Sequence, residues 1–166
     1  MWRAAVLGVV AGMRSQTPAA VLAWRESRGH LPLPVTGPGR LWRRRGAVPI
    51  TALSAIGELF VDKAPVTPSR VEGGPLIGRL GMGALAGSGV ASGFGHSRMV
   101  GAALGAAGAA VGSVGGYRLR VIASETTGIS DTTWALIEDA LAIALALLAT
   151  RSGAVPGGVS SGDAIR

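Results

Sequence analysis

Five apolar segments follow one another along the chain, separated by polar stretches. They cover residues 3–24, 47–61, 76–95, 100–117 and 132–150. A helix needs about 20 apolar residues to cross the roughly 30 Å hydrocarbon core of a membrane. The last three segments meet or nearly meet that length, so the pattern predicts membrane-spanning helices.

The first two segments are irregular. The first reaches spanning length only by crossing the polar stretch 14–18, where Pro18 removes a backbone donor and disfavours helix at the residue before it. The second has 15 residues, a helical rise of only about 22 Å. We therefore expect residues 14–18 and the proline-containing residues 62–68 to interrupt helical structure.

A cleaved signal peptide is the alternative interpretation of the first segment. Arg3 followed by an apolar run fits such a peptide, but Arg14 directly after the run and Pro18 before Ala19 and Ala20 do not suit a signal peptidase. We favour a first membrane helix.

The composition supports a membrane protein. Charged residues make up 15% of the chain, against about 25% in soluble domains. The 27 glycines and the alanines bury little area, so they would build a weak core in water, whereas helices in lipid associate by close backbone approach. The predicted fold is all-α: residues 1–150 form a multi-pass bundle of about five short Gly/Ala-rich spans in the cell membrane, and residues 151–166 form a flexible polar tail.

Glycine pairs four residues apart recur through the chain. This spacing places small residues on one helix face and lets a second backbone approach closely. We expect these faces to pack the bundle, to join the third and fourth segments as a tight hairpin through residues 94–99, and to suit a homo-oligomer in the lipid bilayer. The pairs are Gly8/Gly12, Gly74/Gly78, Gly83/Gly87, Gly89/Gly93, Gly101/Gly105, Gly108/Gly112 and Gly112/Gly116.

Aromatic and basic residues mark the segment ends. Amphipathic rings favour membrane interfaces and arginines favour the cytoplasmic side. The loop 25–45 holds six arginines; placing it in the cytoplasm gives nine basic residues on that side and six on the other. Five spans with an external N-terminus follow. The aromatic residues at the ends are Trp2, Trp24, Trp42, Tyr117 and Trp134.

Several function classes are disfavoured. The net charge of +7 lacks interleaved aromatics, so we expect no nucleic-acid partner. The chain has no cysteine, and His30 and His96 fall in loops, so we expect no metal and no cofactor. The sequence contains no phosphate-binding GxxxxGK[ST] motif and no Ser/His/Asp set, which disfavours an enzyme. A lipid-phosphate enzyme using Arg14 and the polar stretch 63–70 is the weaker alternative.

Ionisable residues inside the apolar segments form the candidate site. Glu58 lies in the second segment with Asp62 one turn later, and Glu138 and Asp139 lie roughly 9 to 11 Å into the fifth. Such a group costs about 2.5 to 3.5 kcal/mol at membrane depth, and Arg14 is the natural cation to offset it. We predict convergence of these residues on one polar site: Arg14, Ser15, Glu58, Asp62, Lys63, Ser69, Arg70, Glu138 and Asp139.

Two functions fit such a site. Discontinuous helices around a polar centre are typical of transporters or channels for a small solute or ion. Alternatively, the cluster is an ion-pair network in a structural or accessory membrane subunit that packs through its glycine faces. Faint similarities between residues 8–24 and 105–121, and between 52–58 and 135–139, favour an inverted repeat and hence transport. An open, wet cavity that reaches Arg14 and Glu58 would favour transport, whereas a sealed, dry core would favour the structural protein.

Three motifs together resemble a known family. GMRSQTP lies near the start, GELFVDKAPVTPSR in the middle, and IEDALAI near the end, after a Gly/Ala-rich hairpin. The combination resembles a bacterial membrane family described only as domain of unknown function 4126, over roughly residues 4 to 150. The resemblance implies a small multi-span protein without an assigned activity, and it supplies no catalytic residues.

Overall fold

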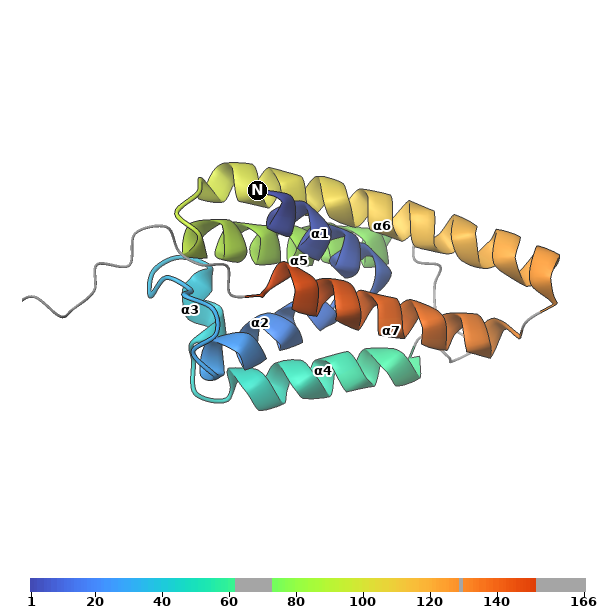
Figure 1. Cartoon of the computed structure of the whole chain (residues 1–166), viewed down its shortest axis with the longest axis horizontal. Helices are drawn as coiled ribbons and strands as arrows, with labels where there is room; N and C mark the ends of the chain where they lie inside the picture. Colours follow the sequence, from blue (N-terminus) through green and yellow to red (C-terminus); the bar gives the residue numbers. More distant parts are fainter. Residues whose placement is uncertain (62–72, 129, 152–166) are drawn as a thin grey trace, which may run out of the picture.

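The computed structural model describes residues 1–61, 73–128 and 130–151, which form seven helices and no strand. The predicted all-α fold is confirmed. The long helices lie alongside one another, with α6 and the start of α7 extending furthest at one end (Figure 1). The helices are α1 (Trp2–Met13), α2 (Thr17–Ser27), α3 (Gly39–Trp42), α4 (Ala47–Val61), α5 (Gly73–Gly93), α6 (Arg98–Thr127) and α7 (Asp131–Ala149).

Helices α1, α5 and α6 form a layer packed through glycine. A Cβ atom added at Gly105 of α6 would lie 2.0 Å from the carbonyl oxygen of Gly83 in α5, and one at Gly8 of α1 would lie 2.2 Å from that of Gly105. Only glycine permits such backbone approach. The predicted packing and the α5–α6 hairpin are confirmed, although Cβ atoms at Gly74 and Gly78 would meet nothing within 4 Å.

The first segment reverses instead of crossing the bundle. Helix α1 ends at Met13 and α2 begins at Thr17, so the predicted interruption is confirmed. Arg3 donates to the carbonyl oxygen of Ala149, and Arg25 donates to that of Leu147. Both ends of the α1–α2 hairpin therefore lie beside the C-terminal end of α7 (Figure 1).

This reversal corrects the predicted orientation. The count of basic residues treated residues 3–24 as one crossing and placed the N-terminus opposite the arginine-rich loop. The break at residues 14–16 instead lets the chain turn back, which puts Arg3 at the same end as that loop.

Helices α2, α4 and α7 form the other side of the bundle. Helix α7 packs against α1, α2 and α6. Within the described residues, the backbone of α4 lies close to α2 and α3 but not to α5 or α7, and a side-chain ion pair between Glu58 and Arg79 joins α4 to α5. Helix α4 is thus a peripheral helix with an open flank on each side of its contact with α2.

The outside of the bundle is apolar. Ile77 on α5, Leu119 on α6 and Leu53 on α4 are each about 70% exposed. Among the described residues, two stretches are able by length and composition to cross a membrane, Arg98–Leu119 and Thr132–Ala149, and about a third or less of each is buried. The core helix of a soluble protein would be mostly buried, so these helices turn much of their apolar surface outward.

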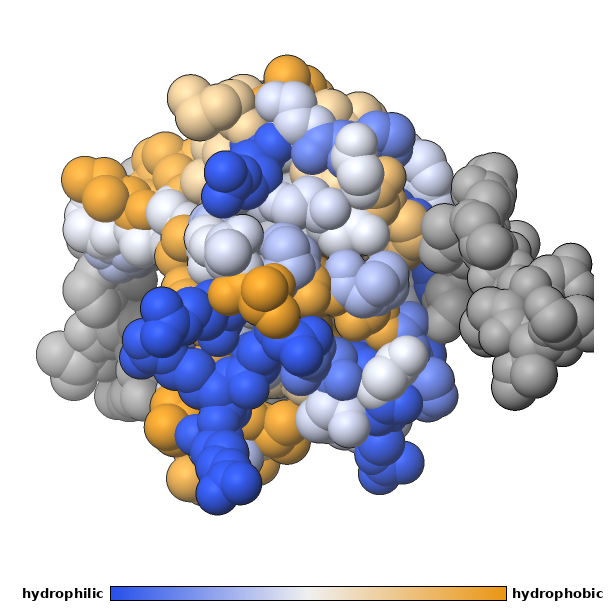
Figure 2. All heavy atoms as spheres, turned by 90° about the vertical axis from the view of Figure 1, so that its left-hand side faces the viewer, coloured by the Kyte–Doolittle hydropathy of each residue, from blue (hydrophilic) through white to orange (hydrophobic). Residues whose placement is uncertain are grey.

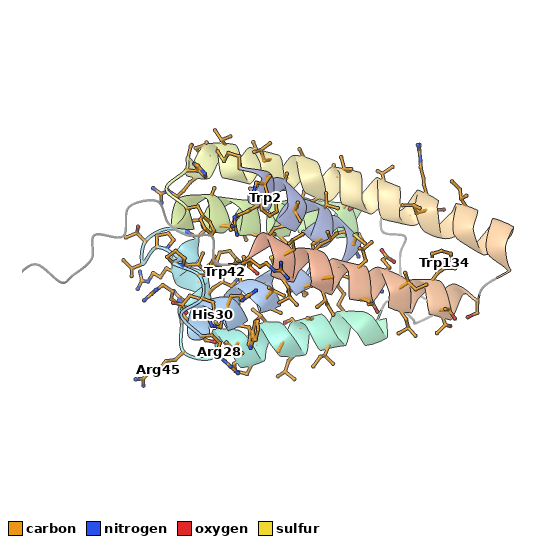
Figure 3. The ribbon with its side chains drawn as sticks, in the orientation of Figure 1. Trp2, Arg28, His30, Trp42, Arg45 and Trp134 are labelled. Carbon is orange, nitrogen blue, oxygen red and sulfur yellow. The ribbon has the colours of Figure 1, made fainter. Side chains whose placement is uncertain are left out.

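The tryptophans only partly follow the predicted pattern. Trp2 and Trp24 are exposed, as expected for interface anchors, and Trp134 lies toward the opposite end from Trp42 (Figure 3). Trp42, in contrast, is 4% exposed, and its ring occupies the space where a Cβ of Gly89 would stand. Trp42 thus packs α3 against α5.

One end of the bundle is strongly basic. Figure 2 shows this end with a large hydrophilic cluster bordered by apolar side chains. Arg98 of α6 reaches Gly37 in the arginine-rich loop, and Arg3 reaches the carbonyl oxygen of Arg151. The exposed arginines here are Arg28, Arg40, Arg43, Arg44, Arg45, Arg98 and Arg151.

The remaining expectations divide into two groups. Residues 8–24 form the reversing hairpin while 105–121 lie within the continuous helix α6, so these stretches are not structural equivalents. The predicted second break at 62–68 and the tail from residue 152 lie outside the described residues.

Candidate functional site

The break between α1 and α2 places two helix ends inside the bundle. Arg14 follows α1 in an extended conformation, and Pro18 occupies the first turn of α2. The last carbonyl groups of α1 and the first amide groups of α2 lack partners within their own helices. Because buried backbone groups need hydrogen bonds, other side chains must supply them.

Glu58 of α4 satisfies backbone amides of the break itself, just before α2. Its Oε1 accepts hydrogen bonds from the backbone nitrogen of Ser15 at 2.7 Å and from Ser15 Oγ at 2.9 Å. Its Oε2 accepts from the backbone nitrogen of Gln16 at 2.9 Å. A carboxylate at this position also complements the positive end of the helix dipole.

Arg79 of α5 satisfies the end of α1. Its Nη1 donates to the carbonyl oxygens of Gly12 at 2.8 Å and Met13 at 3.0 Å, and Ser113 Oγ of α6 donates to Gly12 at 3.3 Å. The Nη2 of Arg79 lies 3.7 Å from Glu58 Oε1. The two charges that cap the broken helix therefore also pair with each other.

Arg14 and Asp139 form a second ion pair beside the first. Arg14 is 2% exposed, and its Nε donates to Oδ1 of Asp139 in α7. A guanidinium buried this deeply needs a carboxylate to offset its lost hydration. The pair fixes the turn of the α1–α2 hairpin against α7.

Glu138 lies on the other side of the same break. It shares a small cavity with Met13 of α1 and Gly116 of α6. A Cβ at Gly116 would stand 3.1 Å from Glu138 Oε1, so glycine at this position leaves room for the carboxyl group. Adjacent carboxyl groups of α7 thus face opposite sides of the hairpin turn.

A groove between α4 and α7 leads to Arg14 and Asp139. This α4–α7 groove has a volume of about 350 Å³, and α2 forms its floor. Apolar side chains, among them Val21, Ala52 and Ile143, line most of it. The groove therefore has apolar walls and ends at an ion pair, and Glu58 does not line it.

Around the break, the structure pairs Ser15 with Glu58 and Arg14 with Asp139, while Glu138 lines a separate cavity on the other side. The other four predicted site residues, Asp62, Lys63, Ser69 and Arg70, lie outside the described residues. Among residues that the structure does describe, no group of three or more His, Asp or Glu side chains is placed to hold a metal ion.

Sequence reasoning missed Arg79. The basic-residue count assigned it to a loop on the far side, whereas it is 5% exposed and caps α1. Its signal was an arginine inside an apolar glycine-rich segment, because a charged residue there normally faces the bundle interior and finds a partner.

The sequence profile of one family covers nearly all of this architecture. Residues 2–158 match the family described as Domain of unknown function (DUF4126). Neither the curated proteins nor the solved structures contain a significant match. The match extends from the first residue of α1 past the end of α7, so the reversing hairpin and the residues that cap it belong to the family's domain. The chain is a member of the DUF4126 family.

Proposed function

We propose that this chain is a multi-pass protein of the cell membrane that binds a small amphipathic solute in the α4–α7 groove and carries it as a transporter or channel. One observation carries the proposal: the groove, about 350 Å³ in volume, ends at the Arg14–Asp139 pair where α1 breaks.

Placement in a membrane is supported by the outer surface. Large apolar side chains are exposed on each of α4, α5, α6 and α7, and extensive exposed apolar surface marks an interaction or membrane surface. The basic end would face the cytoplasm, where anionic lipids attract arginine. The N-terminus, the arginine-rich loop and the end of α7 would share that side.

The groove favours a solute with an apolar body and a small polar head. Val21, Val48 and Ile143 offer surface to the body, while Arg14 and Asp139 offer a cation and an anion to the head. If Arg14 and Asp139 exchanged their bond to each other for bonds to the solute, binding would alter the conformation of the α1–α2 turn. This role needs no bond-making chemistry, so we do not assign an enzymatic activity.

A structural role is the second candidate, favoured by a different observation. Glu58 and Arg79 already occupy both helix ends at the break, so these ends are not open to a solute as they are in many transporters. In that case the cluster fixes the hairpin, and the protein acts through contacts with other membrane proteins.

The two candidates are separated by filling the groove. Ala52 of α4 lines it, whereas neighbouring Leu53 points outward and is 68% exposed. The probes are decanoate, decylammonium and decanol, added to protein in nanodiscs. If the groove binds amphiphiles, one charged probe raises the melting temperature of wild type and of Leu53→Phe more than decanol does, because a ligand stabilises the state it binds.

Two variants should lose this response. Ala52→Phe fills the groove and should abolish the shift by either charged probe, whereas Arg14→Gln removes the cation and should abolish the shift by decanoate. A shift in Ala52→Phe equal to that of wild type contradicts the groove site. No shift in wild type, together with a lower melting temperature for Arg14→Gln, leaves the structural role.

A further inference from the structure

A second groove lies on the opposite flank of α4. This α4–α5 groove has a volume of about 430 Å³ and is bordered by Ile50 and Ser54 of α4, Met82 and Leu85 of α5, and Ala19 of α2. It exists because α4 packs on α2 while its backbone stands apart from that of α5, the Glu58–Arg79 pair being a side-chain contact outside the groove lining. The groove is mostly apolar, and its volume leaves room for one flexible apolar chain.

The entrance of this groove is basic. Arg44 and Arg45 line it, just before α4 begins at Ala47. Figure 3 shows Arg45 extending away from the helices at this end of the bundle. Both side chains are exposed, and within the described residues no acidic group pairs with either.

Neighbouring Arg43 differs in this respect. Its Nη1 lies 2.8 Å from Glu26 Oε1 and also donates to the carbonyl oxygen of Leu33. The guanidinium group of Arg43 is therefore bonded within the protein, whereas those of Arg44 and Arg45 are available to an anion from outside. Guanidinium groups bind phosphate oxygens with paired, charge-assisted hydrogen bonds.

We propose that the α4–α5 groove holds one anionic phospholipid. Its phosphate binds Arg44 and Arg45, and an acyl chain lies between α4 and α5 over Ala19, with Ser54 near the inner end. Charge complementarity selects the anionic headgroup, and the apolar walls select a lipid over a soluble phosphate. The bound lipid fills the space where the backbones of α4 and α5 stand apart.

This site rests on the membrane placement proposed above but is independent of the α4–α7 groove. Successive positions of α4 separate the two: Ala52 lines one groove, Leu53 faces outward, and Ser54 lines the other. Ser54→Phe should therefore block the lipid and spare the solute response, and Ala52→Phe should do the reverse.

The test is native mass spectrometry of the full chain with phosphatidylglycerol and phosphatidylcholine of identical acyl chains. Wild type should retain one phosphatidylglycerol in preference to phosphatidylcholine. Arg44→Gln/Arg45→Gln should weaken that binding by about tenfold or more, because each arginine contributes strongly to attraction of anionic lipid. Ser54→Phe should weaken it with every charge still present.

A charge-matched control is Arg28→Gln/Arg40→Gln. It removes two exposed arginines from the same end, and neither lines the groove. It should keep the bound phosphatidylglycerol, as should Leu53→Phe.

Three results would overturn the proposal. One is an equal loss of bound phosphatidylglycerol in the two double variants, which would mean that the whole basic end attracts the lipid without a specific site. Another is equal retention of both lipids by wild type. The third is competition by glycerophosphoglycerol, the headgroup without acyl chains, at the same concentration as the lipid. If Arg44→Gln/Arg45→Gln does not fold, Ser54→Phe against Leu53→Phe decides alone.

Discussion

At the residue scale, a few charged side chains hold the broken helix. Glu58 accepts from the amides of the break just before α2, and Arg79 caps the end of α1. Their charged groups lie 3.7 Å apart. Each serves backbone groups that would otherwise be buried without partners, and an unsatisfied buried group costs about 1–3 kcal/mol. Their charges also match the dipoles of the two helix ends. The break is therefore a stabilised part of the fold.

Glu58→Gln tests this arrangement. The amide keeps one acceptor but loses the charge that faces Arg79 and the backbone amides of Ser15 and Gln16. We expect the free energy of unfolding in detergent to fall by about 1–3 kcal/mol, measured by chemical denaturation followed by circular dichroism.

The matched control is Glu26→Gln, which removes a carboxylate paired with the 40% exposed Arg43. Glu26 is 15% exposed, but its partner Arg43 stays partly hydrated, so the variant should cost less than Glu58→Gln, which also loses charge-assisted bonds to two backbone amides. Equal losses in the two variants would contradict a capping role for Glu58.

At the element scale, glycine decides how closely helices approach. Helix α6 contacts α5 through Gly101 and Gly105 and contacts α1 through Gly105, Gly108 and Gly112. One helix thus serves two partners with overlapping sets of glycines. The predicted use of the glycine spacing for packing is confirmed within this chain, while its use for a homo-oligomer stays a prediction.

Gly105→Ala should push α5 and α6 apart. Its Cβ would meet backbone atoms of Gly83, which cannot move independently of α5. We expect a loss of at least about 2 kcal/mol, typical of overpacking, in the same unfolding measurement.

Gly115→Ala is the control in the same helix, because its Cβ would meet nothing within 4 Å. It should be neutral or stabilise the protein by up to about 1 kcal/mol, since alanine favours helix over glycine. A neutral Gly105→Ala would mean that α5 and α6 are not in backbone contact.

At the scale of the whole molecule, the reversal after α1 sets the distribution of charge. The N-terminus, the α2–α4 loop, the α5–α6 turn and the end of α7 gather at one end (Figure 1). The arginines of these segments lie together there (Figure 2). A first segment that crossed the bundle would have split them between both ends.

Single cysteines test this topology, because the chain has no native cysteine. In membranes, Trp2→Cys, Ser27→Cys and His96→Cys should react with an impermeant maleimide from one side. Thr132→Cys, at the start of α7, should react only from the other side. Reaction of Trp2→Cys and Ser27→Cys from opposite sides would restore the crossing first span, and release of the protein by a carbonate wash would contradict membrane embedding.

The apolar segments and the polar residues within them were sufficient to predict the helices and much of the candidate site. Pro18 beside polar residues predicted the break, because proline cannot continue a helix hydrogen-bond ladder. Glycine spacing predicted the α5–α6 hairpin, and Arg14 was expected to pair with Glu58, Asp62 or Asp139 because charges within an apolar segment need partners. These are local properties that a sequence displays directly.

Only the tertiary structure decided the direction of the chain after the break and the identity of each partner. A proline at a helix start allows both a kink and a reversal, and the choice depends on how α1 and α2 pack against α6 and α4. That packing pairs Arg14 with Asp139 and places Glu58 where it accepts hydrogen bonds from the amides of Ser15 and Gln16. It also brings Arg79 into the site. The two grooves beside α4 also arise from packing, since they lie where helices do not touch.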